Sequence, residues 1–333
     1  MKKKINVLFA FILTLALILF INGNGMTAKA ETELYLGGIS AGLTIKTDGA
    51  TVIGLSDIVT KDGVFSPAKN ADIKVGDIVI SINGKKVNGA KSITSILSKC
   101  GENPVEIVLE RNGKKVIKYV LPKKDQNGTY KLGFFLRDDL NGIGTITYFT
   151  KNGEFGALGH PVSDDDGKTI PLSGGTSYLC SVIGVVKGQR GKAGEIKGIF
   201  VEDTKIGTLK KNSNTGVYGT ADGNYKYKEL PLTTTGEATM GKATITTCID
   251  GVTTKEYQIS IVKIEKNNKE NKNLVIKILD KELLAETNGI LQGMSGSPIV
   301  QGGKIVGAVT HVFINDPSRG FGILIDKMLE NGI

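Results

Sequence analysis

A glycine-flanked serine near the carboxyl end of the chain is the residue best suited to covalent chemistry. Ser295 lies in the hexapeptide Gly-Met-Ser-Gly-Ser-Pro, residues 293–298. Glycines on both sides let the backbone turn tightly around the serine. The backbone amides of Gly293 and Ser295 can then converge on one point, as the oxyanion hole of an acyl-transfer enzyme requires. The hexapeptide therefore predicts Ser295 as a nucleophile, with Gly293 and Ser295 as oxyanion donors.

A serine nucleophile needs a general base, and the chain has two histidines. His160 lies at an expected strand-to-loop junction, 135 residues before Ser295. This order suits a two-barrel peptidase, in which the first barrel supplies the base and the second the nucleophile. His311 follows Ser295 by 16 residues inside an apolar strand, where packing or pocket lining is its expected role. Because the strand after the nucleophile walls the specificity pocket in such a barrel, we expect Thr310, His311 and Val312 to shape that pocket.

The carboxylate that would orient the base is harder to choose from spacing. Asp280 ends the apolar strand expected at 273–279, which would hold a carboxylate rigidly. The same aspartate is well placed to N-cap a helix expected at 281–287. Spacing alone leaves both roles open. The other aspartates between base and nucleophile are Asp203, Asp222, Asp250 and the run Asp164, Asp165 and Asp166, which is too close to His160 along the chain to be favoured.

An earlier stretch, residues 66–87, carries a different pattern. It runs from Ser-Pro-Ala-Lys through Gly-Asp-Ile-Val-Ile-Ser-Ile to Asn-Gly-Lys-Lys-Val. Its Asn83-Gly84 pair is a strong signal for a two-residue hairpin, because both residues tolerate positive φ. The stretch resembles a PDZ domain, in which a short helix leads into a Gly-Asp turn, a strand and an Asn-Gly hairpin.

A PDZ domain binds an extended peptide by adding it to a sheet edge beside a helix. We expect this domain at residues 36–122, with its edge strand at 41–45 and its helix at 90–99. Gly38 would then lie in the loop before the edge strand, and Leu43 and Ile93 would contact the bound peptide. The alternative is a PDZ-like fold that only packs against its neighbour.

The remaining chain, residues 130–333, is expected to form the peptidase domain. Its pattern Gly-x-Ser-Gly-x-Pro, followed by Ile-Val, a turn and Gly-Ala-Val, resembles chymotrypsin-like peptidases. Forty-four glycines and many short runs of Val, Ile and Thr indicate a mainly β protein. We therefore predict a PDZ-like domain followed by a chymotrypsin-like double β-barrel. Met294 stands where those peptidases often carry Asp, so an ion pair to a newly cut amino terminus is not expected to switch the enzyme on.

The first thirty residues predict export. Three lysines precede an apolar run at residues 5–21, and Ala-Lys-Ala at 28–30 suits signal peptidase. Residues 1–30 are therefore a signal peptide or, if uncleaved, a signal anchor that associates the protein with a membrane. Without its four lysines the net charge falls from +9 to +5, an excess too mild to favour nucleic acid as a partner.

The three cysteines do not suggest a cofactor site. Cys100, Cys180 and Cys248 are too few and too scattered for a disulfide scaffold or a metal site. Small buried thiols are expected, with one bridge between Cys180 and Cys248 as the alternative. No metal and no cofactor is predicted.

Four segments together resemble one peptidase family. They are Gly-Ala-Leu-Gly-His at 156–160, Gln-Gly-Met-Ser-Gly-Ser-Pro-Ile-Val at 292–300, Ile-Val-Gly-Ala-Val-Thr-His-Val-Phe-Ile-Asn-Asp-Pro at 305–317, and the Gly-Phe-Gly-Ile-Leu-Ile-Asp-Lys-Met-Leu-Glu ending. They are similar to the stage IV sporulation protein B family of serine peptidases, and the resemblance extends from the leader to the end. It implies the triad His160, Asp280 and Ser295.

The resemblance also implies a role in a spore-forming bacterium. Members are secreted into the space between forespore and mother cell, cut themselves, and cleave a membrane-bound regulator that restrains an intramembrane protease, so that a late sigma factor is released. The competing hypothesis is a non-catalytic PDZ adaptor with a degenerate barrel. Complete motifs around both His160 and Ser295 favour the enzyme.

Overall fold

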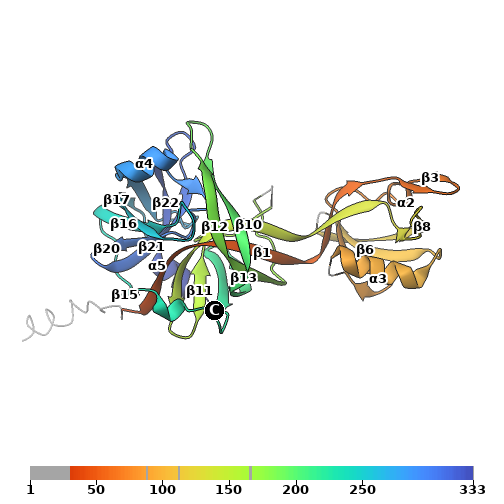
Figure 1. The fold of residues 1–333 in the computed structure, drawn as a ribbon, viewed down its shortest axis with the longest axis horizontal. Helices are drawn as coiled ribbons and strands as arrows, with labels where there is room; N and C mark the ends of the chain where they lie inside the picture. Colours follow the sequence, from red (N-terminus) through yellow and green to blue (C-terminus); the bar gives the residue numbers. More distant parts are fainter. Residues whose placement is uncertain (1–30, 88, 112, 165–166, 333) are drawn as a thin grey trace, which may run out of the picture. The chain divides into compact units, whose positions relative to one another are not determined.

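The computed structural model describes residues 31–87, 89–111, 113–164 and 167–332. The predicted leader, residues 1–30, lies outside the described residues. Within the described ranges no helix is both long and apolar enough to cross a membrane. Strands dominate this part of the chain, as predicted (Figure 1).

Six strands close a first barrel. Their hydrogen-bonded order returns to its start, because the last strand pairs again with the first. Phe149, Phe155 and Ile206 are fully buried in its core. The strands, in barrel order, are β1 (Glu33–Leu55), β10 (Phe134–Thr150), β11 (Glu154–Ala157), β14 (Gly216–Ala221), β13 (Gly194–Ser213) and β12 (Gly174–Val186).

Six later strands close a second barrel, drawn in cyan to blue in Figure 1. Alternation in β17 buries Tyr257, Ile259 and Ile261 in its core. The strands, in order, are β16 (Gly241–Thr247), β17 (Lys255–Ile264), β18 (Leu274–Ile278), β22 (Arg319–Leu324), β21 (Lys304–Val312) and β20 (Pro298–Gln301). The predicted double barrel is confirmed.

The PDZ part has a core of its own. Three alternate side chains of β6, Val105, Ile107 and Leu109, are fully buried and pack with the apolar face of α3. Asn83 and Gly84 have φ of 48° and 71°, so the predicted hairpin forms between β4 and β5. The elements are β2 (Ile58–Thr60), β3 (Gly63–Phe65), α2 (Pro67–Asn70), β4 (Ile78–Ile82), β5 (Lys85–Lys86), α3 (Ala90–Cys100), β6 (Val105–Arg111), β7 (Lys114–Val120), β8 (Lys123–Lys124) and β9 (Tyr130–Lys131).

Short elements complete the chain. Met328 of α5 packs with Leu34 and Leu36 at the start of β1. The elements are η1 (Tyr227–Glu229), β15 (Leu232–Thr234), α4 (Lys281–Thr287), β19 (Leu291–Gln292) and α5 (Ile325–Glu330).

Two long strands, β1 and β10, serve the barrel and the PDZ part in turn. As far as Lys46, β1 pairs with β12 and β10, and from Ala50 it pairs with β4 while keeping β10 as its other partner. A bulge between Lys46 and Thr51 separates the two stretches. The PDZ part is therefore inserted between the first two strands of the barrel in sequence order. This corrects the domain boundary predicted at Leu36.

Candidate active site

His160 follows a strained turn at the end of β11. Leu158 and Gly159 both have positive φ, 67° and 70°, and the N–H of Gly159 donates to the carbonyl of Ala157 at 2.8 Å. A non-glycine residue held at positive φ costs roughly 1–3 kcal/mol. The side chain of Leu158 is buried in the first-barrel core, which offsets that cost. Strain of this kind concentrates where a fold must aim a functional side chain.

The nucleophile loop, residues 293–296, lies between β19 and β20. Gly293 and Gly296 have φ of 101° and 97°, a region that glycine enters without strain. A Cβ at position 296 would lie 2.0 Å from the carbonyl oxygen of Thr145, so only glycine fits. Met294 is fully buried and its sulfur accepts from the N–H of Leu291, so an uncharged thioether stands where chymotrypsin-like peptidases often carry a carboxylate.

The predicted base His160 and the predicted nucleophile Ser295 line one cavity of about 460 Å³, although they come from different barrels. The Ser295 hydroxyl donates to the carbonyl of Thr310 at 2.5 Å. The Nδ1 atom of His160 lies 2.8 Å from the carbonyl of Pro161. In the tautomer with the proton on Nδ1, this N–H donates a hydrogen bond to the Pro161 carbonyl, and Nε2 is the basic nitrogen. For the predicted reaction, the Ser295 hydroxyl must turn from the Thr310 carbonyl toward that nitrogen.

The two imidazoles in the cavity are neighbours. The ring centroids of His160 and His311 are 4.7 Å apart. Burial lowers the pKa of His160, although the Pro161 carbonyl opposes that shift. Burial and the nearby His160 lower the pKa of His311 to about 4. At neutral pH both rings are therefore uncharged, which is the state a general base requires.

Asp280 is not brought to His160. One carboxylate oxygen accepts from the N–H of Leu283 at 3.0 Å and caps α4, and the other accepts from the N–H of Gln258 at 3.3 Å. Asp280 does not line the cavity. Spacing left two roles open for Asp280, orienting His160 or capping α4, and the observed hydrogen bonds are those of the cap.

The other aspartates also lie elsewhere. Asp222 pairs with Lys205 at 3.3 Å, and Asp164 accepts from the N–H of Lys168. Neither Asp203 nor Asp250 lines the cavity, and none of its described lining residues is acidic. Asp165 and Asp166 lie outside the described residues. The group nearest the orienting role is thus the Pro161 carbonyl, which sequence reasoning missed because any residue supplies such an oxygen.

The predicted specificity residues Thr310, His311 and Val312 all line this cavity. Thr310 is 4% exposed, and its hydroxyl finds no partner within the described part of the chain. Most other lining side chains are apolar, including Leu43, Ile45, Leu140, Ile143, Ile290 and Leu291. The cavity therefore combines an apolar wall with a few polar groups beside the serine.

Two predicted peptide-binding residues of the PDZ part lie in the barrel instead. The stretch Ala41–Ile45 pairs on both edges, with β10 and β12, so no edge is left for a peptide. Leu43 is buried and lines the Ser295 cavity. A Cβ on Gly38 would meet Thr246 of the second barrel at 2.7 Å. Both assignments are corrected, because β1 reaches the PDZ part only after its bulge.

A groove of about 720 Å³ does exist within the PDZ part. Ile93, Thr94 and Leu97 of α3 line it together with residues 132–136, which read Leu-Gly-Phe-Phe-Leu. Ile93 thus lies in a groove between a helix and a strand, as expected, but the strand is the start of β10. PDZ domains usually carry a Gly-Leu-Gly-Phe sequence in the loop before the edge strand, and the Leu-Gly-Phe-Phe run at 132–135 is similar to it. This run could have indicated β10 as the peptide-binding strand.

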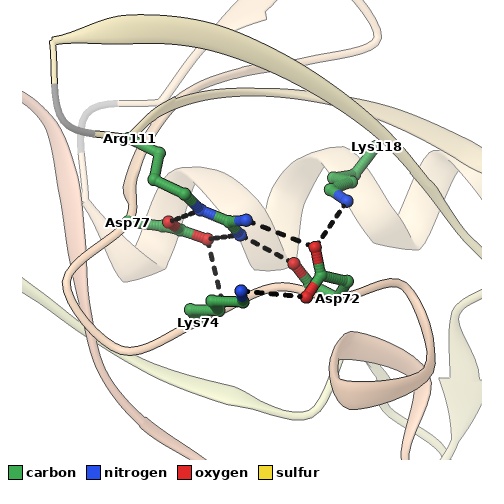
Figure 2. A network of polar contacts seen from close by, with 5 residues as sticks. All are labelled: Asp72, Lys74, Asp77, Arg111 and Lys118. Carbon is green, nitrogen blue, oxygen red and sulfur yellow. Dashed lines mark hydrogen bonds and ion pairs between the residues drawn. The ribbon is translucent and has the colours of Figure 1, made fainter.

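The Gly-Asp turn of the PDZ pattern has a clear structural role. Asp77 is 1% exposed, and its carboxylate accepts from Nε and a terminal nitrogen of Arg111 at 2.6 and 2.7 Å (Figure 2). It also accepts from the N–H of Lys74, which closes the turn. Asp72 belongs to the same network, because its carboxylate accepts hydrogen bonds from Arg111 and Lys118. Burial alone would raise the pKa of Asp77, but the hydrogen bonds from Arg111 and Lys74 outweigh it and lower the pKa.

Two barrels with a histidine from one and a glycine-flanked serine from the other define a chymotrypsin-like serine peptidase. Residues 128–329 match the family described as SpoIVB peptidase S55, and residues 59–111 match the PDZ domain. The chain belongs to the SpoIVB peptidase S55 family and is a serine endopeptidase that carries a PDZ domain.

Two further similarities are local. A probable protease eep of Enterococcus faecalis is 40% identical over 60 residues, which are 18% of this chain and 14% of that relative. The PDZ domain of an SdrC-like protein from Listeria monocytogenes is 21% identical, with a TM-score of 0.23. That match covers 28% of this chain and 93% of the solved domain.

Proposed function

We propose that this chain is an exported regulatory endopeptidase of sporulation signalling, with Ser295 as nucleophile and His160 as base. The observation that carries the catalytic part is the shared cavity, which His160 lines from the first barrel and Ser295 from the second. Ser295 Oγ attacks the scissile carbonyl and its proton passes to Nε2 of His160, which returns it to the leaving amine. The N–H groups of Gly293 and Ser295 hold the oxyanion.

A serine-directed fluorophosphonate tests this assignment. The wild-type protein should be labelled at Ser295, and Ser295→Ala should abolish labelling. His160→Ala should slow it strongly, since a serine without its base is a poor nucleophile. An unlabelled wild type with an intact fold would favour the non-catalytic adaptor instead.

We propose Thr310, His311 and Val312 as the wall that selects the substrate side chain. Support comes from their place beside Ser295 in a cavity that is otherwise mostly apolar. Profiling cleavage of a peptide library with the wild type and His311→Ala measures the selection. An unchanged profile would show that His311 does not contribute to it.

The proposed substrates are the chain itself and a membrane-bound regulator that restrains an intramembrane protease. The proposed location is the space between forespore and mother cell, with the leader cleaved or retained as an anchor. Family membership and the leader composition support this role. In sporulating cells, Ser295→Ala should block self-cleavage and release of the late sigma factor. Normal release by that variant would refute the signalling role.

We further propose that the groove between α3 and β10 binds an extended peptide of the substrate or of the chain itself. Ile93 and Leu97 face it from the helix side. Ile93→Asp should impair cleavage of the protein substrate while sparing hydrolysis of a short peptide. Equal loss of both activities would mark the groove as scaffolding.

A further inference from the structure

Two buried threonines of β10 hold the nucleophile loop. Thr145 and Thr147 are 2% and 0% exposed. The Thr145 hydroxyl donates to the carbonyl of Gly293 at 2.9 Å, and the Thr147 hydroxyl donates to that of Gly296 at 2.8 Å. The N–H of Thr145 donates to the carbonyl of Ser295 at 2.9 Å. Three hydrogen bonds from a first-barrel strand thus end on three carbonyls around the nucleophile of the second barrel.

Thr145 also holds the turn that carries the base. Its carbonyl accepts from the N–H of Leu158 at 3.2 Å, two residues before His160. A Cβ on Gly296 would lie 2.0 Å from that carbonyl and 2.6 Å from the Leu158 nitrogen, so strand, loop and turn meet with no room between them. Thr145 is therefore bonded both to the base-bearing turn and to the nucleophile loop.

These bonds fix the peptide planes that matter for catalysis. The carbonyls of Gly293 and Ser295 belong to the peptides on either side of the one that carries the Ser295 N–H. Holding both neighbours fixes the direction in which that predicted oxyanion donor points. Preorganised donors supply much of the rate in acyl transfer, and a misplacement of about 1 Å can cost about 100-fold.

We propose that Thr145 and Thr147 are positioning residues that keep the Ser295 loop and the His160 turn in register. This inference rests on the proposed roles of Ser295 and His160. The hydroxyls touch neither substrate nor the reacting atoms. They act through the backbone of the loop, so their loss should lower kcat much more than it changes KM.

Valine and serine variants test the hydroxyls separately from the side-chain volume. Thr145→Val keeps the branched shape and removes the donor, whereas Thr145→Ser keeps the donor. We expect Thr145→Val to lower kcat by about 10- to 100-fold, with KM changed by less than about 3-fold. Labelling of Ser295 by the fluorophosphonate should slow by a similar factor. Thr145→Ser should recover most of both rates, and Thr147→Val and Thr147→Ser should follow the same pattern.

Thr247→Val is the matched control. Thr247 is a buried threonine of β16, and its hydroxyl has no partner within the described residues. The kcat and the labelling rate of Thr247→Val should therefore stay at the wild-type level. Wild-type kcat in a folded Thr145→Val protein, or a change in KM alone, would overturn the positioning role while the proposed function stands. If Thr145→Val does not fold, Thr147→Val decides by the same criteria. An unlabelled wild type would refute the proposed function, and the positioning role with it.

Discussion

The lowered pKa of the proposed base His160 results from burial rather than from a charged partner. Its pKa is lowered from the ordinary 6.5 because desolvation disfavours the imidazolium. Only the neutral ring can accept the Ser295 proton, so activity is lost as pH falls through that lowered pKa. We expect the acid limb of kcat/KM to have its midpoint below pH 6.5. A midpoint near pH 7 or above would instead show a carboxylate beside His160 in the working enzyme.

Two substitutions of different severity test the role of Asp280. Asp280→Ala removes both carboxylate oxygens that accept backbone N–H bonds and should cost about 0.5–2 kcal/mol of stability, as for other helix caps. Asp280→Asn keeps one oxygen acceptor, and Asn caps helices about as well as Asp. If Asp280 acts through α4 and the segment leading to Ser295, activity should follow melting temperature, with Asn above Ala. An Asn variant that melts normally but is at least about 100-fold less active would restore Asp280 as the orienting carboxylate that the family resemblance implies.

Some of the candidate site residues could be predicted from the sequence, and others could not. Ser295 and His160 could be found because glycines mark the tight turns around them. Thr145 could not be found, because a threonine in an alternating strand looks like any barrel residue. Its partner Gly293 is 148 residues away, and only the closed barrels bring the two together.

Among the elements, the Arg111–Asp77 pair joins the Gly-Asp turn to β6. Arg111→Met would leave the nearly inaccessible Asp77 carboxylate without its cation, a loss that typically costs about 3 kcal/mol. We expect a lower melting transition of the PDZ part with near-normal labelling of Ser295 in protein that remains folded. Adding Asp77→Leu to Arg111→Met should recover stability, because it removes the unpaired charge. No recovery in the double variant would show that the turn itself, through the Lys74 N–H bond, is what matters.

Elements with strong local signals could be predicted from the sequence. The predicted helices at 90–99 and 281–287 match α3 and α4 to within one residue at each end. The long strands β12 and β13 were not predicted, because glycines and lysines interrupt their apolar pattern. The strand at 41–45 was predicted, but its assignment as an edge strand of the PDZ domain was wrong. Strand pairing depends on contacts with residues far along the chain, which a local pattern does not contain.

At the scale of the whole molecule, the inserted PDZ part can be removed cleanly only at the bulge. Lys46 and Asp139 are cross-strand partners, so residues 47–138 can be replaced by Asn-Gly to give a two-residue hairpin. This variant should fold and label at Ser295 at a rate within about 10-fold of the wild type. Deletion of residues 36–122 is the contrasting variant. It removes part of a barrel strand, so it should fail to fold. A folded, active 36–122 deletion would contradict the assignment of β1 to the barrel.

We expect the separation of β1 and β10 along the chain to affect folding of the protein as well. The β1 strand leaves the ribosome long before β10, and during that interval its apolar residues have no barrel to enter. Closing such a long loop carries an entropy cost that grows slowly with length. A PDZ part that folds first places Lys46 beside Asp139 and removes most of that cost before the barrel begins to form. Weakening the Arg111–Asp77 pair should therefore slow refolding of the peptidase and increase its aggregation, even where the mature enzyme is fully active.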